Sequence, residues 1–280
     1  MAWGFFKKIV LADRLARYVD SAYGDVNNIG GAPVVYAIIF FAFQLYLDFS
    51  AYSDIAIGSA RTLGFKLSVN FKRPYLASSF SDFWKRWHIS LSSWFKDYVY
   101  IPMGGNRVSK NRHLRNIIIV FVISGLWHGA SWNFVIWGAI NGLFIILFDN
   151  LFFAKNRIKN ISRVFSSIFI SLFWALSLVF FRAKTFGDAF AMFSSLPFKS
   201  DKTIYDYGLV ETEFKFTIWL LILFILFEIL VEKRENLYTW FISLNFIFRW
   251  VIYVVLVSSI VFLGSYGVGL NDSNFIYFQF

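Results

Sequence analysis

Six apolar stretches, each close to the length of a membrane-spanning helix, recur along this chain. They lie at approximately residues 34–52, 116–131, 133–152, 164–181, 216–231 and 246–264. A helix needs about 20 apolar residues to cross the hydrocarbon core of a bilayer. Inside lipid each segment must satisfy its own backbone hydrogen bonds, which favours helices. The stretches therefore predict an all-α, polytopic integral membrane protein.

The overall composition supports a membrane protein and excludes thiol chemistry. Hydrophobic residues make up 58%, aromatic residues 22% and charged residues only 16% of the chain, whereas soluble domains carry about 25% charged residues. Cysteine is absent. Disulfides, cysteine metal ligands and a cysteine nucleophile are therefore excluded.

Positive charge is concentrated in one segment. Residues 61–115 hold eleven Lys or Arg and two Asp, a surplus of nine out of the net charge of +10. In a polytopic protein a basic loop indicates the cytoplasmic side, so we expect no nucleic-acid partner. The same surface suits an anionic donor such as coenzyme A or the phosphopantetheine of a carrier protein.

The first 20 residues do not fit this simple topology. Four basic residues lie among apolar ones, namely Lys7, Lys8, Arg14 and Arg17. Such a mixture is typical of an amphipathic helix at the membrane interface. The alternative is the end of a further transmembrane helix.

Residues 76–104 show a helical pattern within the basic segment. Ser79 or Ser81 is a suitable N-cap, and Pro102 with Gly104 is a suitable end. Three- and four-residue spacing places several rings on one face, which comprises Trp84, Trp87, His88, Leu91 and Phe95. We predict a re-entrant or interfacial helix here.

His128 is the ionisable residue that most needs an explanation. It follows a run of apolar residues, and an ionisable side chain at membrane depth indicates a functional site. The alternative is a hydrogen bond between packed helices. Arg115 lies 13 residues earlier, about 20 Å of helix, which places His128 beyond the midplane of a core of about 30 Å. Gly125 and Gly129 add little bulk, so we expect a substrate to approach the ring closely.

The other ionisable residues favour structural roles. Asp48 and Asp54 are six residues apart, about 600° around a helix, and so face different directions. We expect hydrogen bonds to neighbouring helices from both. Glu228 is expected either to extend its carboxylate to the membrane interface or to pair there. His113 is predicted to be a solvated loop residue. Two candidate histidines without cysteine make an incomplete metal ligand set, so no metal is expected.

Several ordered motifs resemble the membrane-bound O-acyltransferase (MBOAT) family, and most closely its alginate O-acetyltransferase branch. They are Tyr46-Leu-Asp48-Phe-Ser50, Asn70-Phe-Lys-Arg-Pro74-Tyr75, Phe83-Trp-Lys-Arg-Trp-His88, Tyr100-Ile-Pro-Met-Gly-Gly-Asn106 and Ser124-Gly-Leu-Trp-His128, with a similar C-terminal run 274–280. Members of that family are longer at the N-terminus. We therefore expect residues 1–280 to form a single MBOAT-like domain that corresponds to the C-terminal part of the family and lacks its N-terminal helices.

The resemblance implies acyl transfer from a thioester to a hydroxyl. It implies that His128 is the essential catalytic histidine. His88 is the second catalytic candidate, and it belongs to the basic segment, nearer a cytoplasmic donor. The alternative for His88 is a structural residue of an interfacial aromatic belt. Family analogy also implies that the substrate is bound by Asn70, Arg86, Trp87, Tyr98 and Trp127. Acyl-CoA or an acyl-phosphopantetheine carrier is then a substrate, and no bound cofactor is expected.

The sequence thus predicts an O-acyltransferase of the bacterial cytoplasmic (inner) membrane. The expected group is acetyl. The resemblance favours an extracytoplasmic polysaccharide as acceptor, as in alginate or other exopolysaccharide biosynthesis, and peptidoglycan, teichoic acid or an intermediate acyl carrier are the alternatives. A periplasmic acetyltransferase partner is also expected. The alternatives are a polytopic transporter and a non-catalytic subunit of a polysaccharide export complex, because intramembrane Asp and His residues also mark ion pathways.

Overall fold

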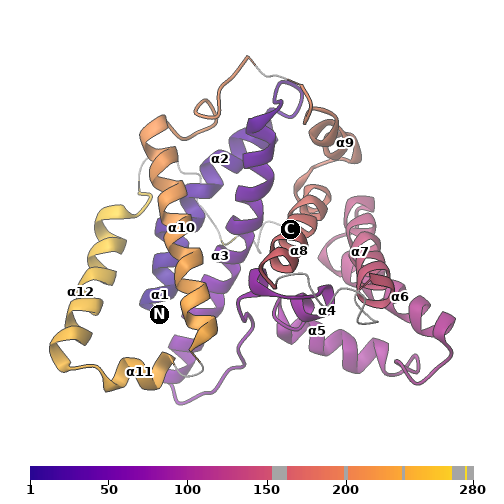
Figure 1. Ribbon diagram of the computed structural model, residues 1–280, viewed down its shortest axis with the longest axis horizontal. Coiled ribbons are helices and arrows are strands. Elements are labelled where there is room, and N and C mark those ends of the chain that lie inside the picture. The colour runs from indigo at the N-terminus through magenta and orange to yellow at the C-terminus, as the bar shows by residue number, and fades with distance from the viewer. Residues whose placement is uncertain (153–162, 199–200, 235–236, 267–274, 276–280) are drawn as a thin grey trace. The chain divides into compact units, whose positions relative to one another are not determined.

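A computed structural model describes residues 1–152, 163–198, 201–234, 237–266 and 275 (Figure 1). Every regular element within these ranges is a helix, which confirms the predicted all-α fold. The C-terminal run 274–280, apart from Phe275, lies outside the described residues. The helices are α1 (Ala2–Phe5), η1 (Phe6–Ala12), α2 (Asp13–Gly24), α3 (Ala32–Thr62), η2 (Pro74–Leu76), α4 (Phe80–Trp84), α5 (Ile89–Phe95), η3 (Lys96–Tyr100), α6 (Lys110–His128), α7 (Trp132–Phe144), η4 (Ile145–Phe152), α8 (Arg163–Arg182), α9 (Phe186–Ser194), α10 (Glu211–Lys233), α11 (Leu237–Ser243) and α12 (Phe246–Leu263).

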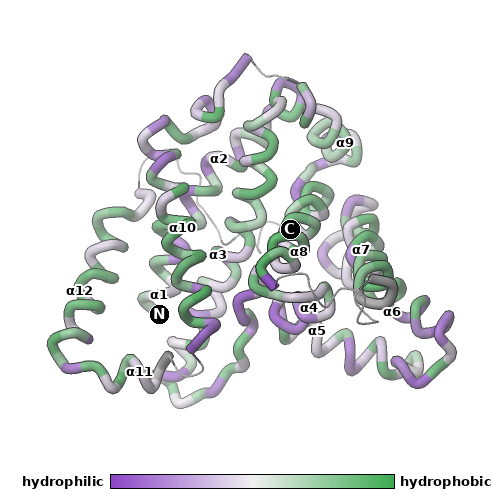
Figure 2. The backbone as a smooth tube through the Cα atoms, viewed as in Figure 1, coloured by the Kyte–Doolittle hydropathy of each residue, from purple (hydrophilic) through white to green (hydrophobic). Residues whose placement is uncertain are grey.

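Four of the described helices are long and apolar enough to cross a membrane. They are α3, α8, α10 and α12, and Figure 2 shows the last two as largely hydrophobic along their length. The other two predicted spans are also helical. The first is realised by α6, which begins earlier, at Lys110, and ends at His128. The second is realised by α7 and continues into η4.

Contacts divide the described residues into two compact units. The first comprises residues 1–25, 40–68 and the described part of 200–279, and the second comprises residues 26–39 and the described part of 69–199. The expectation of a single domain over residues 1–280 stays a prediction.

Aromatic rings form the centre of the first unit. Tyr18 of α2 is fully buried, and its ring lies 5.1 Å from that of Phe40 on α3 and 5.7 Å from that of Phe214 on α10. Figure 1 shows these three helices running side by side. The exposed apolar surface of α10 and α12 fits lipid contact.

Three of the four basic residues near the N-terminus are buried, namely Lys7, Lys8 and Arg14. Lys7 and Lys8 are only 4% and 8% exposed, because both lie against α3. The Lys7 ammonium lies 2.9 Å from a carboxylate oxygen of Asp54 and donates to the Ser50 hydroxyl at 2.6 Å. Ion pairs thus draw these two lysines inward, and the location of the segment at a membrane interface stays a prediction.

A second, separate ion cluster surrounds Lys8. Its ammonium lies 2.6 Å from Asp48 and 2.9 Å from Asp13. Asp48 and Asp54 thus bind different lysines, as their angular separation on α3 predicted. Glu228 accepts a hydrogen bond of 2.8 Å from the Tyr46 hydroxyl, which gives the expected pairing.

The second unit is held together around Trp174 of α8, which is 2% exposed. Its ring lies 4.7 Å from that of Phe83 and 4.9 Å from that of Trp87, so the α4 segment packs on α8. Two asparagines of α7 extend the same core: Asn133 donates to the carbonyl of Ala183 at 2.9 Å, and Asn141 donates to the Ser177 hydroxyl at 3.4 Å.

The segment 76–104 forms short helices instead of one continuous helix. Ser79 caps α4 by accepting from the Asp82 N–H, as predicted. The helix then breaks, because His88 adopts a left-handed backbone with φ of 43°. A non-glycine residue in this region costs about 1–2 kcal/mol, and α5 begins only after it.

The Lys8 cluster leads to a stability prediction. Replacing Lys8 by Met leaves the carboxylates of Asp48 and Asp13 buried together, which should lower the free energy of unfolding by about 3–5 kcal/mol. Adding Asp48→Asn should recover part of the loss, because one uncompensated charge disappears. Thermal unfolding in detergent measures both effects. Lys66→Met, at an exposed lysine, is the control, and equal unfolding temperatures for Lys8→Met and Lys66→Met would contradict the prediction.

Candidate active site

A pocket of about 730 Å³ lies within the second unit. Its walls come from the α4–α5–η3 segment on one side and from α6 and α7 on the other. All five residues of the predicted aromatic face line it: Trp84, Trp87, His88, Leu91 and Phe95. His88 and His128 line the same pocket, so the structure brings together the two histidines that the sequence singled out.

His128 is the last residue of α6, and its ring is enclosed by aromatic side chains. The rings of Trp127, Trp137 and Phe181 stand nearly perpendicular to it, at centroid distances of 5.0, 5.2 and 5.1 Å. The side chain is half-buried. Packing of this kind fixes the ring plane, and no hydrogen bond of the imidazole is seen among the residues that the structure describes.

His88 lies in the turn between α4 and α5 and is 9% exposed. Its Nδ1 lies 3.3 Å from the side-chain oxygen of Asn70, and its ring packs 6.4 Å from those of Phe71 and Trp127. Burial, and secondarily the neighbouring His128, lower the pKa of His88 well below its ordinary value. The ring is therefore neutral near pH 7, which is the form that a base or a hydrogen-bond acceptor needs.

The residues predicted to bind substrate are placed in different ways. Trp87 is buried and lines the pocket. Asn70 lies behind His88 rather than at the pocket wall, and Trp127 packs between the two histidine rings. Arg86 forms an ion pair of 2.9 Å with Asp82. Tyr98 is 68% exposed, and its ring lies against that of Trp94.

Of these five residues only Trp87 lines the pocket within the described part of the chain. Arg86 and Tyr98 do not line this pocket, and their part in binding substrate stays a prediction. The reason is local: Asp82 draws the guanidinium of Arg86 back along α4, and η3 turns Tyr98 outward.

His113 also lines the pocket, contrary to the prediction of a solvated loop residue. It lies in the first turns of α6, with Nε2 3.5 Å from the Tyr100 hydroxyl. His113 and His128 lie on the same face of α6. The residues of that face between them, at helical spacing, also line the pocket, namely Ile117, Val120, Phe121 and Ser124. That spacing is visible in the sequence and was missed because the helix was expected to begin at residue 116.

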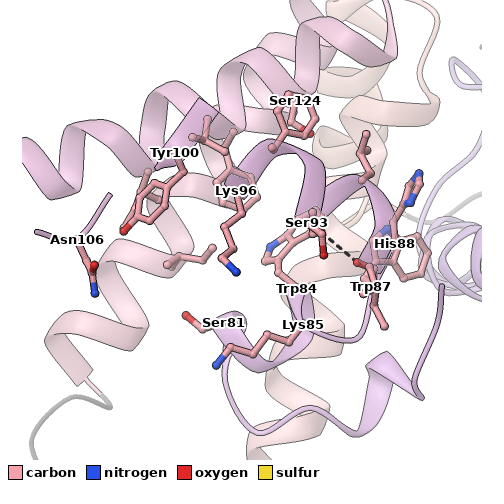
Figure 3. A pocket seen from close by; sticks show the side chains of 18 of the residues that line it. Ser81, Trp84, Lys85, Trp87, His88, Ser93, Lys96, Tyr100, Asn106 and Ser124 are labelled. Carbon is pink, nitrogen blue, oxygen red and sulfur yellow. Dashed lines mark hydrogen bonds between the residues drawn. The ribbon is translucent and has the colours of Figure 1, made fainter. Parts of the chain in front are cut away.

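Two lysines contribute charge to the pocket, Lys85 at the end of α4 and Lys96 at the start of η3. Figure 3 shows their ammonium groups and the Ser81 hydroxyl turned toward the same part of the pocket. None of the described residues that line it is Asp or Glu. Lys96 has one acidic neighbour, Asp97, at 3.9 Å, and both side chains are exposed. The pocket is thus electrostatically suited to an anion.

The glycines near His128 serve helix packing. A Cβ on Gly125 would overlap the carbonyl oxygen of Phe134, and a Cβ on Gly138 would overlap that of Phe121. The backbones of α6 and α7 therefore touch at this level. Gly129 faces the ring of Phe134. The expectation that Gly125 and Gly129 open space for a substrate is wrong, because α7 fills it.

The chain belongs to the membrane-bound O-acyltransferase (MBOAT) family, whose model matches residues 3–181. The match includes every residue that lines the pocket. No group of three or more acidic or histidine residues able to hold a metal occurs within the described ranges. The expectation of no bound metal or cofactor stays a prediction.

Three relatives illustrate the range of this family. The chain is 39% identical over 205 residues to "Probable alginate O-acetylase AlgI" of Azotobacter vinelandii, covering 72% of this chain and 40% of the relative. It is 40% identical over 191 residues to the peptidoglycan O-acetyltransferase of Helicobacter pylori, covering 66% and 36%. It is 31% identical over 160 residues to the teichoic acid D-alanyltransferase of Streptococcus thermophilus, covering 52% and 38%. The chain spans about two fifths of the length of these relatives.

The contact between α6 and α7 gives a prediction for the site. Replacing Gly125 by Ala forces the two helix backbones apart, because the added methyl group overlaps a carbonyl that cannot move aside. We expect a loss of about 1–3 kcal/mol in the free energy of unfolding and a displaced His128. Thermal unfolding measures the first effect. Gly187→Ala is the matched control, since its Cβ meets nothing closer than 3.6 Å, and an equal, small effect at both positions would refute the close contact.

Proposed function

We propose that the protein is a membrane O-acyltransferase that moves an acyl group, in the first instance acetyl, from a thioester to the hydroxyl of an extracytoplasmic polymer. The observation that carries the proposal is the single pocket lined by both His88 and His128 in a chain of the MBOAT family. Acyl-CoA or an acylated phosphopantetheine carrier is the donor substrate in this proposal.

Proton transfer defines the part that we assign to His128. Its neutral imidazole takes the proton of the acceptor hydroxyl as that oxygen attacks the thioester carbonyl carbon. The new C–O bond forms, the C–S bond breaks, and the imidazolium returns its proton to the departing thiolate. The products are an ester and a free thiol, and the histidine is regenerated. The rings of Trp137 and Phe181 pack against that of His128 and hold its plane for this proton transfer.

The polar part of the pocket supports an anionic donor. Lys85 and Lys96 supply two positive charges to the lining, and Ser81, Tyr100 and Asn106 supply uncharged hydrogen-bonding groups. Phosphate oxygens of coenzyme A or phosphopantetheine accept such bonds. These lysines lie in the basic segment that the positive-inside rule places in the cytoplasm, where thioester donors are made.

The acceptor is inferred from the relatives. Their names specify alginate, peptidoglycan and teichoic acid, which are polymers of saccharide or polyol units. We propose such a polymer, or an intermediate acyl carrier, on the far side of the bacterial inner membrane, with a periplasmic acetyltransferase as partner. A multi-pass arrangement is supported by the four candidate spans.

The buried charges of the first unit do not favour the transporter alternative. Lys7 and Lys8 are each within 2.9 Å of carboxylates of α3 or α2. Such fixed pairs join helices, whereas an ion pathway needs groups that exchange their partners.

Replacement of His128 tests the proposal. In the full chain produced in its own cells, His128→Ala and His128→Gln should reduce acetyl esters on the secreted polymer by about 10²–10⁴-fold, because the general base is lost. Mass spectrometry of the polymer measures the esters, and thermal unfolding shows whether the variants fold. Unchanged ester content with folded protein excludes the role. A fall in polymer export with the ester content per sugar retained would support the transporter instead.

The donor assignment has its own test. The double variant Lys85→Gln/Lys96→Gln should raise the KM for a phosphate-bearing thioester about tenfold, since two charged hydrogen-bond donors are removed, with little change in kcat. The control is Lys66→Gln/Lys110→Gln, which removes two charges from the same basic segment without touching the pocket. Equal changes in KM for both double variants would show that only overall charge matters.

A further inference from the structure

Asn70 is the centre of a hydrogen-bond cluster that surrounds His88. Its side-chain oxygen accepts from the Ser90 backbone N–H at 3.1 Å and from the Ser90 hydroxyl at 3.0 Å. The same oxygen lies 3.3 Å from Nδ1 of His88. The backbone carbonyl of Asn70 also accepts from the Ile89 N–H at 3.0 Å. One residue thus contacts three consecutive positions at the start of α5.

These contacts determine which way the Asn70 amide faces. A backbone N–H can only donate, so the group that faces Ser90 must be the amide oxygen rather than the NH₂ group. An oxygen can only accept. The His88 nitrogen beside it must therefore carry the proton, because two lone pairs 3.3 Å apart repel each other.

We propose that Asn70 is a positioning residue that holds His88 as the tautomer with hydrogen on Nδ1 and a lone pair on Nε2. This inference rests on the proposed function and gives His88 a defined part in it. His88 is then a proton or hydrogen-bond acceptor at Nε2, able to act as a base beside His128. It cannot donate at that atom, so it does not stabilise the carbonyl oxygen of the thioester as charge develops there.

The left-handed backbone of His88 supports a role beyond packing. His88 and Arg73 are the two non-glycine residues with positive φ within the described residues. Backbone strain of this kind is retained where the surroundings enforce it, and it clusters at functional sites. Here the contacts of Asn70 enforce the left-handed conformation of His88, because they hold the backbone of the next two residues, Ile89 and Ser90.

Few charged groups compete for control of His88. The pocket that His88 lines contains five other titratable side chains: His113, His128, Lys85, Lys96 and Tyr100. Arg86 and Asp82, just before it, pair with each other. Phe71 and Trp127 cover the ring with aromatic surface. A carboxylate introduced at position 70 would therefore raise the pKa of His88 through their direct contact.

Two substitutions at position 70 separate positioning from helix capping. Asn70→Asp keeps an acceptor for Ser90 and for Nδ1, and its charge raises the pKa of His88. Because protonated His88 cannot accept at Nε2, the acid limb of the kcat/KM profile should move to higher pH by about one unit or more. At alkaline pH activity should be restored. Asn70→Leu keeps the volume but no acceptor, and should lower kcat about 10–100-fold with little effect on donor KM.

A purely structural cap predicts a different pattern. Asp caps a helix as well as Asn does, so Asn70→Asp would then restore activity with an unchanged pH profile. That result overturns the proposal, as does an Asn70→Leu variant with undiminished kcat. The Ser90 hydroxyl lies 3.4 Å from the same Nδ1 and 3.0 Å from the Asn70 oxygen. Ser90→Ala removes it but keeps the contact of Asn70 with Nδ1, so it should shift the acid limb of the pH profile much less than Asn70→Asp does.

A measurement independent of activity separates this inference from the proposed function. In the full chain labelled with ¹⁵N-histidine, the signals of His88 are identified by their loss in His88→Gln. We expect a protonated Nδ1 and an unprotonated Nε2, with this preference lost in Asn70→Leu. The reverse tautomer overturns the inference. The expected tautomer in a protein without acyl-transfer activity would leave Asn70 as the residue that positions His88 and reject the proposed function alone.

Discussion

The direct contact of α6 with α7 is the constraint on which the rest of the candidate site depends. Gly125 and Gly138 allow each helix to touch the backbone of the other, and no larger residue fits at either position. In membranes, where lipid is as apolar as the side chains, small residues at such a contact are a principal source of helix association. The contact fixes the end of α6, and so places His128 against Trp137 and Phe181.

Much of the fold could be predicted from the sequence because apolar length and periodicity are local signals. The long helices, the Ser79 cap and the separate pairing of Asp48 and Asp54 all follow from spacing. The N-terminal helices could not be placed, since lysines among apolar residues fit an interface as well as a buried ion pair. Only the position of α3 decides between them.

The sequence allowed the two histidines of the candidate site to be predicted, but not the arrangement of the side chains around them. Motif resemblance singled out His88 and His128, and the structure places both at one pocket. Arg86 and Tyr98 belong to the same motifs, but a neighbouring Asp82 and the turn of η3 direct them elsewhere. Asn70 contacts His88, and its predicted contact with substrate is untested. A motif shows which residues are neighbours in the sequence. The left-handed backbone at His88 determines which of their side chains come into contact.

The face of α6 that runs from His113 to His128 determines the shape of the pocket. Fifteen residues of helix separate the two side chains, a distance of about 22 Å. His113 and His128 both line the pocket, so a molecule that contacts both must extend along most of α6. A rigid helix sets how far such a molecule must extend.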